Sequence, residues 1–248
     1  MFRRKFQYHK TLAPYIWDNS AEINQLVSQS LQMMVAEYIR YLGNVIGLPI
    51  SSEDIVDIFI HGSIANYYWD KHSDIDLCIV ADLSKLNKTL PNLDKLLFFR
   101  NMYWGWRSSF GVSLFGHNVD IFILDTTEVQ SVFTNTVDTF FSLFSNKWAI
   151  PPKRVPDEEL NALQKTTYKK YRVIKRQCKH ILKQKMTYDF IDAYLVALKR
   201  HRRKNSTSSY NYMITSTQMA FKMARNSGMF SKLQKASRRQ KSKRYTME

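Results

Sequence analysis

Ile60-His61-Gly62-Ser63, followed after ten further residues by Asp74-Ile75-Asp76-Leu77, is the stretch that decides the fold of this chain. The apolar residues before Gly62 predict a strand over 54–62, and the small residues predict a turn leading into a short helix over 64–71. Backbone N–H groups and a hydroxyl at such a turn favour phosphate. Gly62 and Ser63 are therefore the expected phosphate-binding residues.

Two carboxylates follow on the next predicted strand, residues 74–80. Alternate residues of a strand point to the same face, so Asp74 and Asp76 can hold divalent ions together. A third carboxylate, Asp120, lies within a further predicted strand over 118–124. Two-metal phosphoryl chemistry requires acids that bridge two ions and one that holds or deprotonates the attacking hydroxyl. The pattern therefore predicts a site for a magnesium nucleotide.

These motifs resemble the DNA polymerase β-like nucleotidyltransferase superfamily. Its signature is an apolar residue, Gly-Ser, a spacer of about this length, an Asp-apolar-Asp strand and a later single acid on a neighbouring strand. The resemblance covers residues 50–125, about half of the chain. It implies that Asp74, Asp76 and Asp120 are catalytic and hold two Mg²⁺ ions, with Mn²⁺ as an alternative. It also implies that Gly62 and Ser63 bind the triphosphate.

One departure from this signature concerns the residues after the Gly-Ser pair. Many members with small nucleotidyltransferase domains carry Arg-Gly at the places where this chain has Asn66 and Tyr67. The usual contact from that arginine to phosphate is thus missing from the pattern. Taken singly, the motifs also have plain structural interpretations, since Gly-Ser is a common turn and Asp-x-Asp is often a solvated strand face or a calcium-like loop. Their order and spacing together favour the functional interpretation.

The charge of the chain is divided unevenly between its two parts. Residues 1–150 hold 12 Lys and Arg against 15 Asp and Glu, a net charge of −3, whereas residues 151–248 hold 25 against 6, a net charge of +19. This asymmetry indicates a polyanionic partner held by its phosphates, most simply RNA or DNA, and the resemblance to template-independent terminal transferases favours RNA. The alternatives are a solvated basic surface or a tail attracted to membranes. The candidate nucleic-acid-binding residues are Lys165, Lys169, Lys170, Arg172, Lys175, Arg176 and Lys179.

The predicted fold class is α/β (α+β), a small mixed sheet flanked by helices and followed by a helical basic C-terminal region. Residues 1–150 form the expected catalytic domain with an N-terminal helix, 151–230 a helical basic domain, and 231–248 a flexible basic tail. The predicted elements are a helix starting at Asn19 and continuing to Val45, helices over 92–107, from 157, over 188–204 and over 210–226, and a strand near 111–116 joined to the next by a turn at 116–118.

Composition excludes several other classes of site. Cys78 and Cys178 lie far apart in the sequence and predict reduced, packed thiols with no zinc or disulfide framework. No run of 18 or more apolar residues occurs, and the N-terminus lacks the apolar segment of a secretory signal. We therefore expect a cytoplasmic protein with no membrane partner; the oligomeric state is left open.

The predicted activity is metal-dependent transfer of a nucleoside monophosphate from a nucleoside triphosphate to an acceptor hydroxyl, most simply on RNA, as in template-independent terminal transferases of the superfamily. Three alternatives stay open at this point. The enzyme could make a cyclic or oligonucleotide signal, or it could modify a protein or a small molecule. The third alternative is a nucleic-acid-binding module with an inactive transferase domain.

Overall fold

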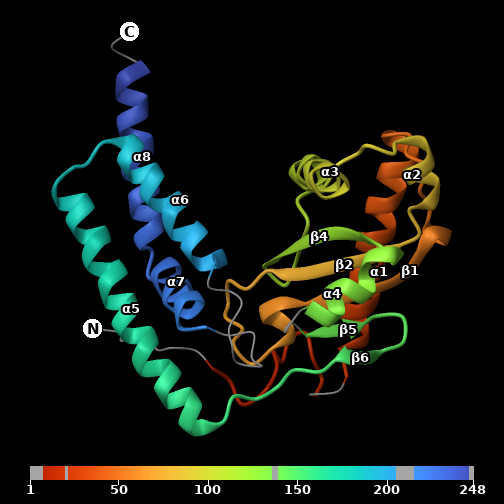
Figure 1. Cartoon of the computed structure of the whole chain (residues 1–248), viewed down its shortest axis with the longest axis horizontal. Coiled ribbons are helices and arrows are strands. Elements are labelled where there is room, and N and C mark those ends of the chain that lie inside the picture. The colour runs from red at the N-terminus through yellow and green to blue at the C-terminus, as the bar shows by residue number, and fades with distance from the viewer. Residues whose placement is uncertain (1–7, 20–21, 136–138, 205–214, 246–248) are drawn as a thin grey trace. The chain divides into compact units, whose positions relative to one another are not determined.

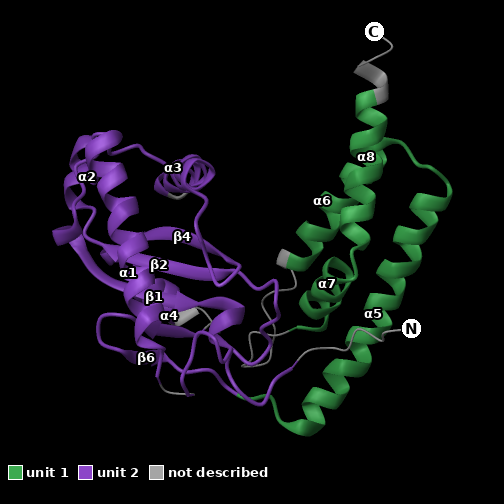
Figure 2. Cartoon of the chain, turned by 180° about the vertical axis from the view of Figure 1, so that it is seen from behind, with its two compact units in different colours: residues 1–6, 154–248 green, residues 7–153 purple. Residues whose placement is uncertain are grey.

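The computed structural model of the chain describes residues 8–19, 22–135, 139–204 and 215–245. These residues form two compact units (Figure 2), which we call the sheet unit, within residues 7–153, and the helical unit, from residue 154 onward. The boundary lies between Pro152 and Pro156, within the proline-rich joint of the sequence. Each unit is described separately below.

The sheet unit is built on a six-stranded mixed sheet (Figure 1). Only β2 and β4 pair in parallel, and the other neighbouring strands pair antiparallel. The predicted fold class, a mixed sheet with flanking helices and a helical C-terminal region, is confirmed. The sheet order is β3-β4-β2-β1-β5-β6, and the strands are β1 (Ile55–His61), β2 (Ile75–Ala81), β3 (Ser113–Leu114), β4 (His117–Asp125), β5 (Phe140–Ser142) and β6 (Lys147–Ile150).

Helices cover both faces of this sheet. On one face, Leu77 and its neighbours at even spacing pack against α1 (Gln25–Arg40) and α3 (Lys95–Phe110). On the other face, Cys78 and Phe140 pack beside α4 (Val129–Asn135), which lies on the opposite side of the sheet from α1 (Figure 1). Because the strand period is two, Asp76 and Asp120 belong to this second face.

The first helix begins later than predicted. The Asn24 side chain accepts hydrogen bonds from the N–H groups of Leu26 and Val27, so α1 starts at Gln25. Asn19 instead accepts from the Glu22 N–H at 3.0 Å in a turn outside the helix, so the start at Asn19 was wrong. After Arg40 the helix continues as a π-helix over Tyr41–Val45.

The helix predicted over 64–71 is also wrong. Gly62–Ala65 forms a single 3₁₀ turn that ends at Asn66, whose backbone is extended (φ −144°, ψ 172°). Tyr67 and Tyr68 after it are both buried. Residues 64–68 are buried without interruption, and a surface helix could not turn five consecutive positions toward one buried face. Burial of the tyrosines thus prevails over the helical signal.

The structure contains elements that the sequence did not predict. They are the helix α2 (Ser84–Thr89), α4, β5, β6 and the 3₁₀ turns Ser52–Asp54 and Thr126–Glu128. The hairpin turn predicted at 116–118 is formed instead by Phe115 and Gly116, which both have positive φ, 50° and 77°. Two consecutive positive φ values are typical of the type I′ turn that joins paired strands.

The helical unit contains α5 (Asp157–Lys183), α6 (Tyr188–Lys204), α7 (Ser216–Asn226) and α8 (Met229–Tyr245). Three acidic residues occupy the first turn of α5, where the helix dipole favours them. Cys178, Ile191 and Phe221 belong to one apolar core to which all four helices contribute. Residues 210–214 of the predicted helix over 210–226 lie outside the described residues.

The prediction of a flexible tail from residue 231 is also wrong. Residues 229–245 form α8, in which Leu233 is fully buried and the buried Ser237 hydroxyl donates to Asp192 at 2.8 Å. Gln240 donates to the Met186 carbonyl oxygen at 2.9 Å. Leu233, Ser237 and Gln240 recur at helical spacing, and two of the three make polar contacts, which an apolar pattern alone does not reveal. No described helix is long and apolar enough to cross a bilayer.

Candidate active site

Strand pairing brings the predicted catalytic residues into one row. Asp76 on β2 is paired with Asp120 on the parallel strand β4, and His61 on β1 is paired with Asp76. Paired residues on adjacent strands lie on the same face of the sheet, about 5 Å apart. Asp74 precedes β2 by one residue, and its charge acts on Asp120. The structure therefore brings the three predicted carboxylates together. We call Asp74, Asp76 and Asp120 the carboxylate row.

Gly62 makes room for one of these carboxylates. Its φ is +75°, and a Cβ built at this position would overlap the Asp76 carboxylate oxygen. Any other residue would therefore be strained in its backbone and would displace Asp76. This close approach explains the glycine at the end of β1 and joins the predicted phosphate-binding turn to the carboxylate row.

Ser63 is tied to the residue that precedes Asp74. Its hydroxyl donates to the hydroxyl of the buried Ser73 at 3.0 Å, and the Ser73 hydroxyl accepts from the Asp70 N–H at 2.9 Å. The Ser73 carbonyl oxygen accepts from His117 Nδ1 at 2.6 Å. These hydrogen bonds hold both ends of the segment 64–73, which separates Ser63 from Asp74. The turn and the Asp74 backbone therefore hold each other in place.

Asp120 forms an ion pair with Arg107 of α3, a residue that sequence reasoning missed. The Asp120 pKa is raised, mainly by burial and further by the charge of Asp74, whereas Arg107 acts in the opposite direction. Nearby, burial and the charge of Asp120 raise the pKa of Tyr103 to about 12. Tyr103 stays protonated and donates its hydroxyl to the Val119 carbonyl oxygen. Arg107 and Tyr103 of α3 thus both contact β4, the strand that carries Asp120.

The three carboxylates are suited to divalent ions because they offer oxygen ligands and lie on neighbouring strands. Oxygen donors are the ligands that Mg²⁺ and Mn²⁺ prefer. In the described part of the chain, however, no three His, Cys, Asp or Glu side chains already form a ligand group. Asp120 is engaged by Arg107, and Asp74 accepts from Asn118 Nδ2 at 3.3 Å. Loading the site would therefore require these side chains to exchange partners.

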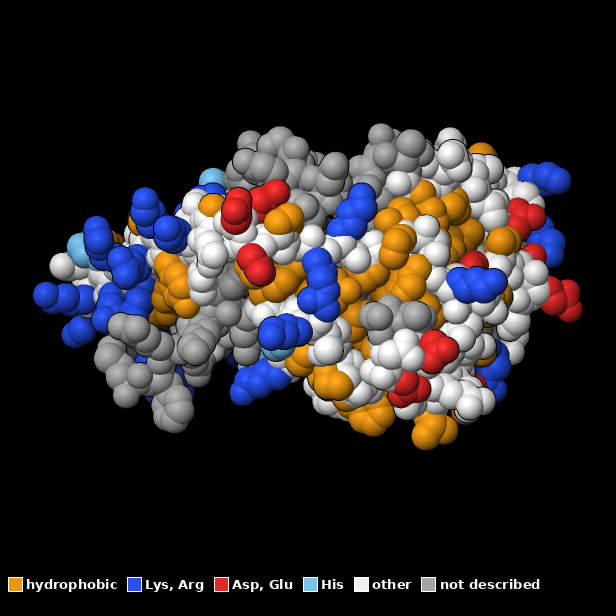
Figure 3. Space-filling view, turned by 90° about the horizontal axis from the view of Figure 1, so that it is seen from below, with side chains coloured by type: hydrophobic (Ala, Val, Ile, Leu, Met, Phe, Trp, Pro, Cys, Tyr) orange, Lys and Arg blue, Asp and Glu red, His pale blue; other side chains and the backbone are white. Residues whose placement is uncertain are grey.

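The candidate nucleic-acid residues lie on α5. Lys165, Lys169, Arg172, Arg176 and Lys179 are all exposed and recur at alternating spacings of four and three, so they form one stripe along the helix. We call these five residues the α5 ridge. Figure 3 shows many Lys and Arg side chains gathered on the surface of the helical unit.

The other two candidates on α5 lie beside the α5 ridge. Lys170 donates to the Thr217 hydroxyl of α7 at 2.7 Å, and the Lys175 ammonium lies 5.9 Å from the centre of the Tyr171 ring. The Lys170 contact therefore joins α5 to α7, whereas the Lys175 contact lies within α5.

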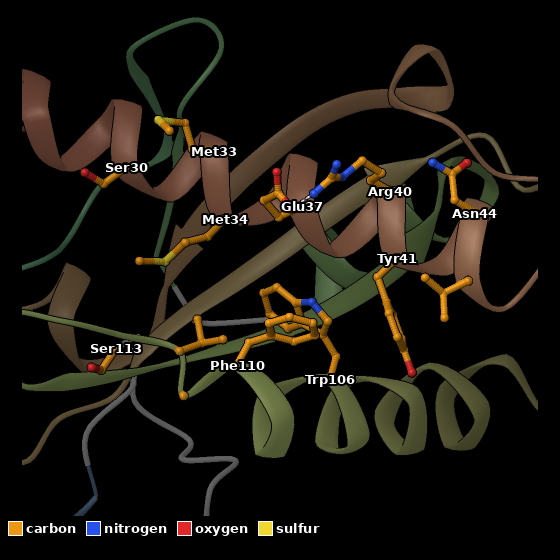
Figure 4. Close-up of a pocket in the computed structure, with 13 residues that line it drawn as sticks. Ser30, Met33, Met34, Glu37, Arg40, Tyr41, Asn44, Trp106, Phe110 and Ser113 are labelled. Atoms are coloured by element: carbon orange, nitrogen blue, oxygen red, sulfur yellow. Dashed lines mark hydrogen bonds and ion pairs between the residues drawn. The ribbon is translucent and has the colours of Figure 1, made fainter.

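A separate cavity of about 700 Å³ lies between α1 and α3 (Figure 4). Trp106 and Phe110 of α3 point into it from one side, and Met34 and Tyr41 lie on the other. The helices that form it pack against the sheet face that carries Leu77. None of the predicted site residues lines this cavity.

A weak signal for Arg107 was present in the sequence. It is the single Lys or Arg between Arg100 and Lys147, in a stretch that also contains Asp120. Nothing in the spacing indicated that α3 would bring it to the carboxylates. Asn118 shares the strand face of Asp120, two residues before it, and the same alternation that grouped Asp74 with Asp76 could have identified it.

Comparison of the chain with protein-family models, with curated proteins and with solved structures gave no match.

Proposed function

We propose that the protein is a metal-dependent nucleotidyltransferase that moves a nucleoside monophosphate from a nucleoside triphosphate to an acceptor hydroxyl, with release of pyrophosphate. The observation that carries the proposal is the pairing of Asp76 with Asp120 on adjacent parallel strands, next to the Gly62 turn. Acids on neighbouring strands at one sheet face suit two ions about 4 Å apart.

The positions of the residues support a separate role for each. Asp74 and Asp76 would hold the ion that accompanies the triphosphate, and Asp76 and Asp120 would hold the ion beside the acceptor hydroxyl. When bound, Mg²⁺ lowers the pKa of the attacking hydroxyl and neutralises charge on the phosphoryl oxygens. The N–H groups of Gly62 and Ser63 would face the β- and γ-phosphates. Asp120 would favour the deprotonated form of the attacking hydroxyl.

RNA is the acceptor that the charge distribution supports best. The α5 ridge is exposed along about four turns, and its cations can contact successive phosphates without reading bases. The +19 charge of residues 151–248 also disfavours a polycationic small-molecule acceptor, which would require an acidic surface.

The acceptor can be identified by following labelled nucleotide. Purified protein would be incubated with Mg²⁺, total RNA and each of the four α-³²P-labelled nucleoside triphosphates in turn. We expect label at RNA 3′ ends with one preferred triphosphate, and no label with the Asp76→Asn variant. Label found in protein or in a small soluble product, with none in RNA, would contradict the RNA acceptor.

A further inference from the structure

The phosphate-binding turn of this protein offers little positive charge. Gly62–Ala65 is a single 3₁₀ turn that ends in extended backbone at Asn66, so this turn brings no helix dipole to the site. The side chains of Asn66 and Tyr67 after it are neutral. A triphosphate that lies beside three carboxylates requires compensating cations beyond the metal ions, because several like charges would otherwise repel.

Arg107 is placed to supply such a cation from α3. Its guanidinium pairs with Asp120, and its side chain is only 17% exposed. The guanidinium also lies 5.1 Å from the centre of the Trp104 ring, a cation–π distance. The Arg107 carbonyl oxygen accepts from the N–H of Gly111, which caps α3. The stem of the arginine is thus anchored in the last turns of α3 while its head lies at the carboxylate row.

We propose that Arg107 is a triphosphate-binding residue and that Asp120 is its partner only in the free protein. The inference rests on the nucleotidyltransferase function proposed above. A guanidinium presents the same planar fork to a carboxylate and to a phosphate. When the Asp120 oxygens coordinate an ion, Arg107 would lose its ion-pair partner. Its charge would then be largely buried and unpaired, which is strongly unfavourable. A phosphate oxygen of the substrate restores the lost contact.

The partner exchange has two consequences of opposite sign. Replacing Arg107 by Gln removes the phosphate contact, so affinity for a triphosphate should fall. The same replacement releases Asp120 and removes a positive charge beside it, so affinity for a divalent ion in the absence of phosphate should rise. A residue that merely stabilises the fold would change both affinities in the same direction.

The test uses the full chain and two binding measurements. Inorganic tripolyphosphate binding is measured by calorimetry in the presence of Mg²⁺, and Mn²⁺ binding is measured by electron paramagnetic resonance without phosphate. We expect Arg107→Gln to weaken tripolyphosphate binding roughly tenfold or more, the effect of losing a charge-assisted contact. We expect it to tighten Mn²⁺ binding by about fivefold, the effect of removing one nearby like charge.

Two further variants make the result specific. Arg107→Lys keeps the charge and loses the fork, so tripolyphosphate affinity should lie between those of the wild type and Arg107→Gln. Arg100→Gln removes an exposed charge from the same helix two turns earlier and should leave both affinities unchanged. Melting temperatures verify that each variant is folded, and Arg107→Lys provides the test if Arg107→Gln does not fold.

The outcomes separate this inference from the function on which it rests. Unchanged tripolyphosphate affinity in the Arg107 variants, with Mn²⁺ binding still abolished by Asp76→Asn, would overturn the role of Arg107 alone. A fall in both affinities in Arg107→Gln would also overturn it, since that result indicates a structural role. Failure of the wild-type protein to bind Mn²⁺ or tripolyphosphate would overturn the proposed function itself.

Discussion

Replacing Gly62 by alanine tests how closely the turn and the carboxylate row are joined. The added Cβ would meet the Asp76 carboxylate at less than van der Waals distance, and the φ of +75° disfavours any side chain. The backbone strain of a non-glycine residue in this region is about 1 kcal/mol. Displacing a catalytic carboxylate by about 1 Å costs on the order of a hundredfold in rate. We therefore expect a modest loss of stability and a severe loss of transfer.

Gly47 offers a matched control for this prediction. Its φ is also +75°, but a Cβ there would contact nothing within 4 Å. Gly47→Ala should thus show the backbone strain alone, a fall in melting temperature of roughly 3 °C with nearly unchanged transfer. The assay compares melting temperature and initial rate of nucleotide transfer for both variants and the wild type. The reasoning would be refuted if Gly62→Ala retained activity within a few-fold of Gly47→Ala.

Three further predictions concern other parts of the molecule. Asp120→Asn should reduce turnover by at least roughly a hundredfold while changing the triphosphate Kd little, because Gly62, Ser63, Asp74 and Asp76 still hold the nucleotide; an equal loss in both would place Asp120 in ground-state binding. Charge reversal of Lys169, Arg172, Arg176 and Lys179 to Glu should weaken RNA binding and flatten its dependence on salt between about 50 and 300 mM, with the triphosphate Kd unchanged; RNA affinity equal to that of the wild type would remove the α5 ridge from the account. Burial acts to raise the pKa of Asp125, but hydrogen bonds from Asn87, Thr127 and Lys95 outweigh it and hold this pKa well below its usual value. The ionised Asp125 therefore stabilises the fold above about pH 4, and this contribution is lost as pH falls through the lowered pKa; Asp125→Asn should cost roughly 3 kcal/mol at pH 7 and less in acid, as measured by urea unfolding.

The strands that carry the site were predictable because their signal is local. β1, β2 and β4 are apolar runs bounded by turn residues, and alternation along the sequence groups Asp74 with Asp76. What alternation could not give is the pairing of β2 with β4, since strand order depends on contacts between distant residues. The sequence therefore predicts three candidate carboxylates, and the strand pairing in the structure places Asp76 opposite Asp120.

The errors lie where tertiary contacts prevail over local preference. The sequence after Gly62 favours a helix, but the backbone forms a single 3₁₀ turn, and the buried Tyr67 and Tyr68 follow it in place of a helix. The segment from residue 231 looks like a solvated tail because it is so basic, yet Leu233 and Ser237 give α8 a buried side. Arg107 was missed for a similar reason, because its contact with Asp120 joins a helix to a strand.

The central claim is that the carboxylate row performs metal-dependent nucleotidyl transfer. The most direct measurement is pyrophosphate release from a nucleoside triphosphate by the wild-type protein and by Asp76→Asn, with RNA present and with Mg²⁺ added or chelated. We predict release that requires Mg²⁺, equals the amount of nucleotide transferred, and disappears in the variant while its melting temperature stays within a few degrees of the wild type. Release that persists in folded Asp76→Asn, or after Mg²⁺ has been chelated, would contradict the account.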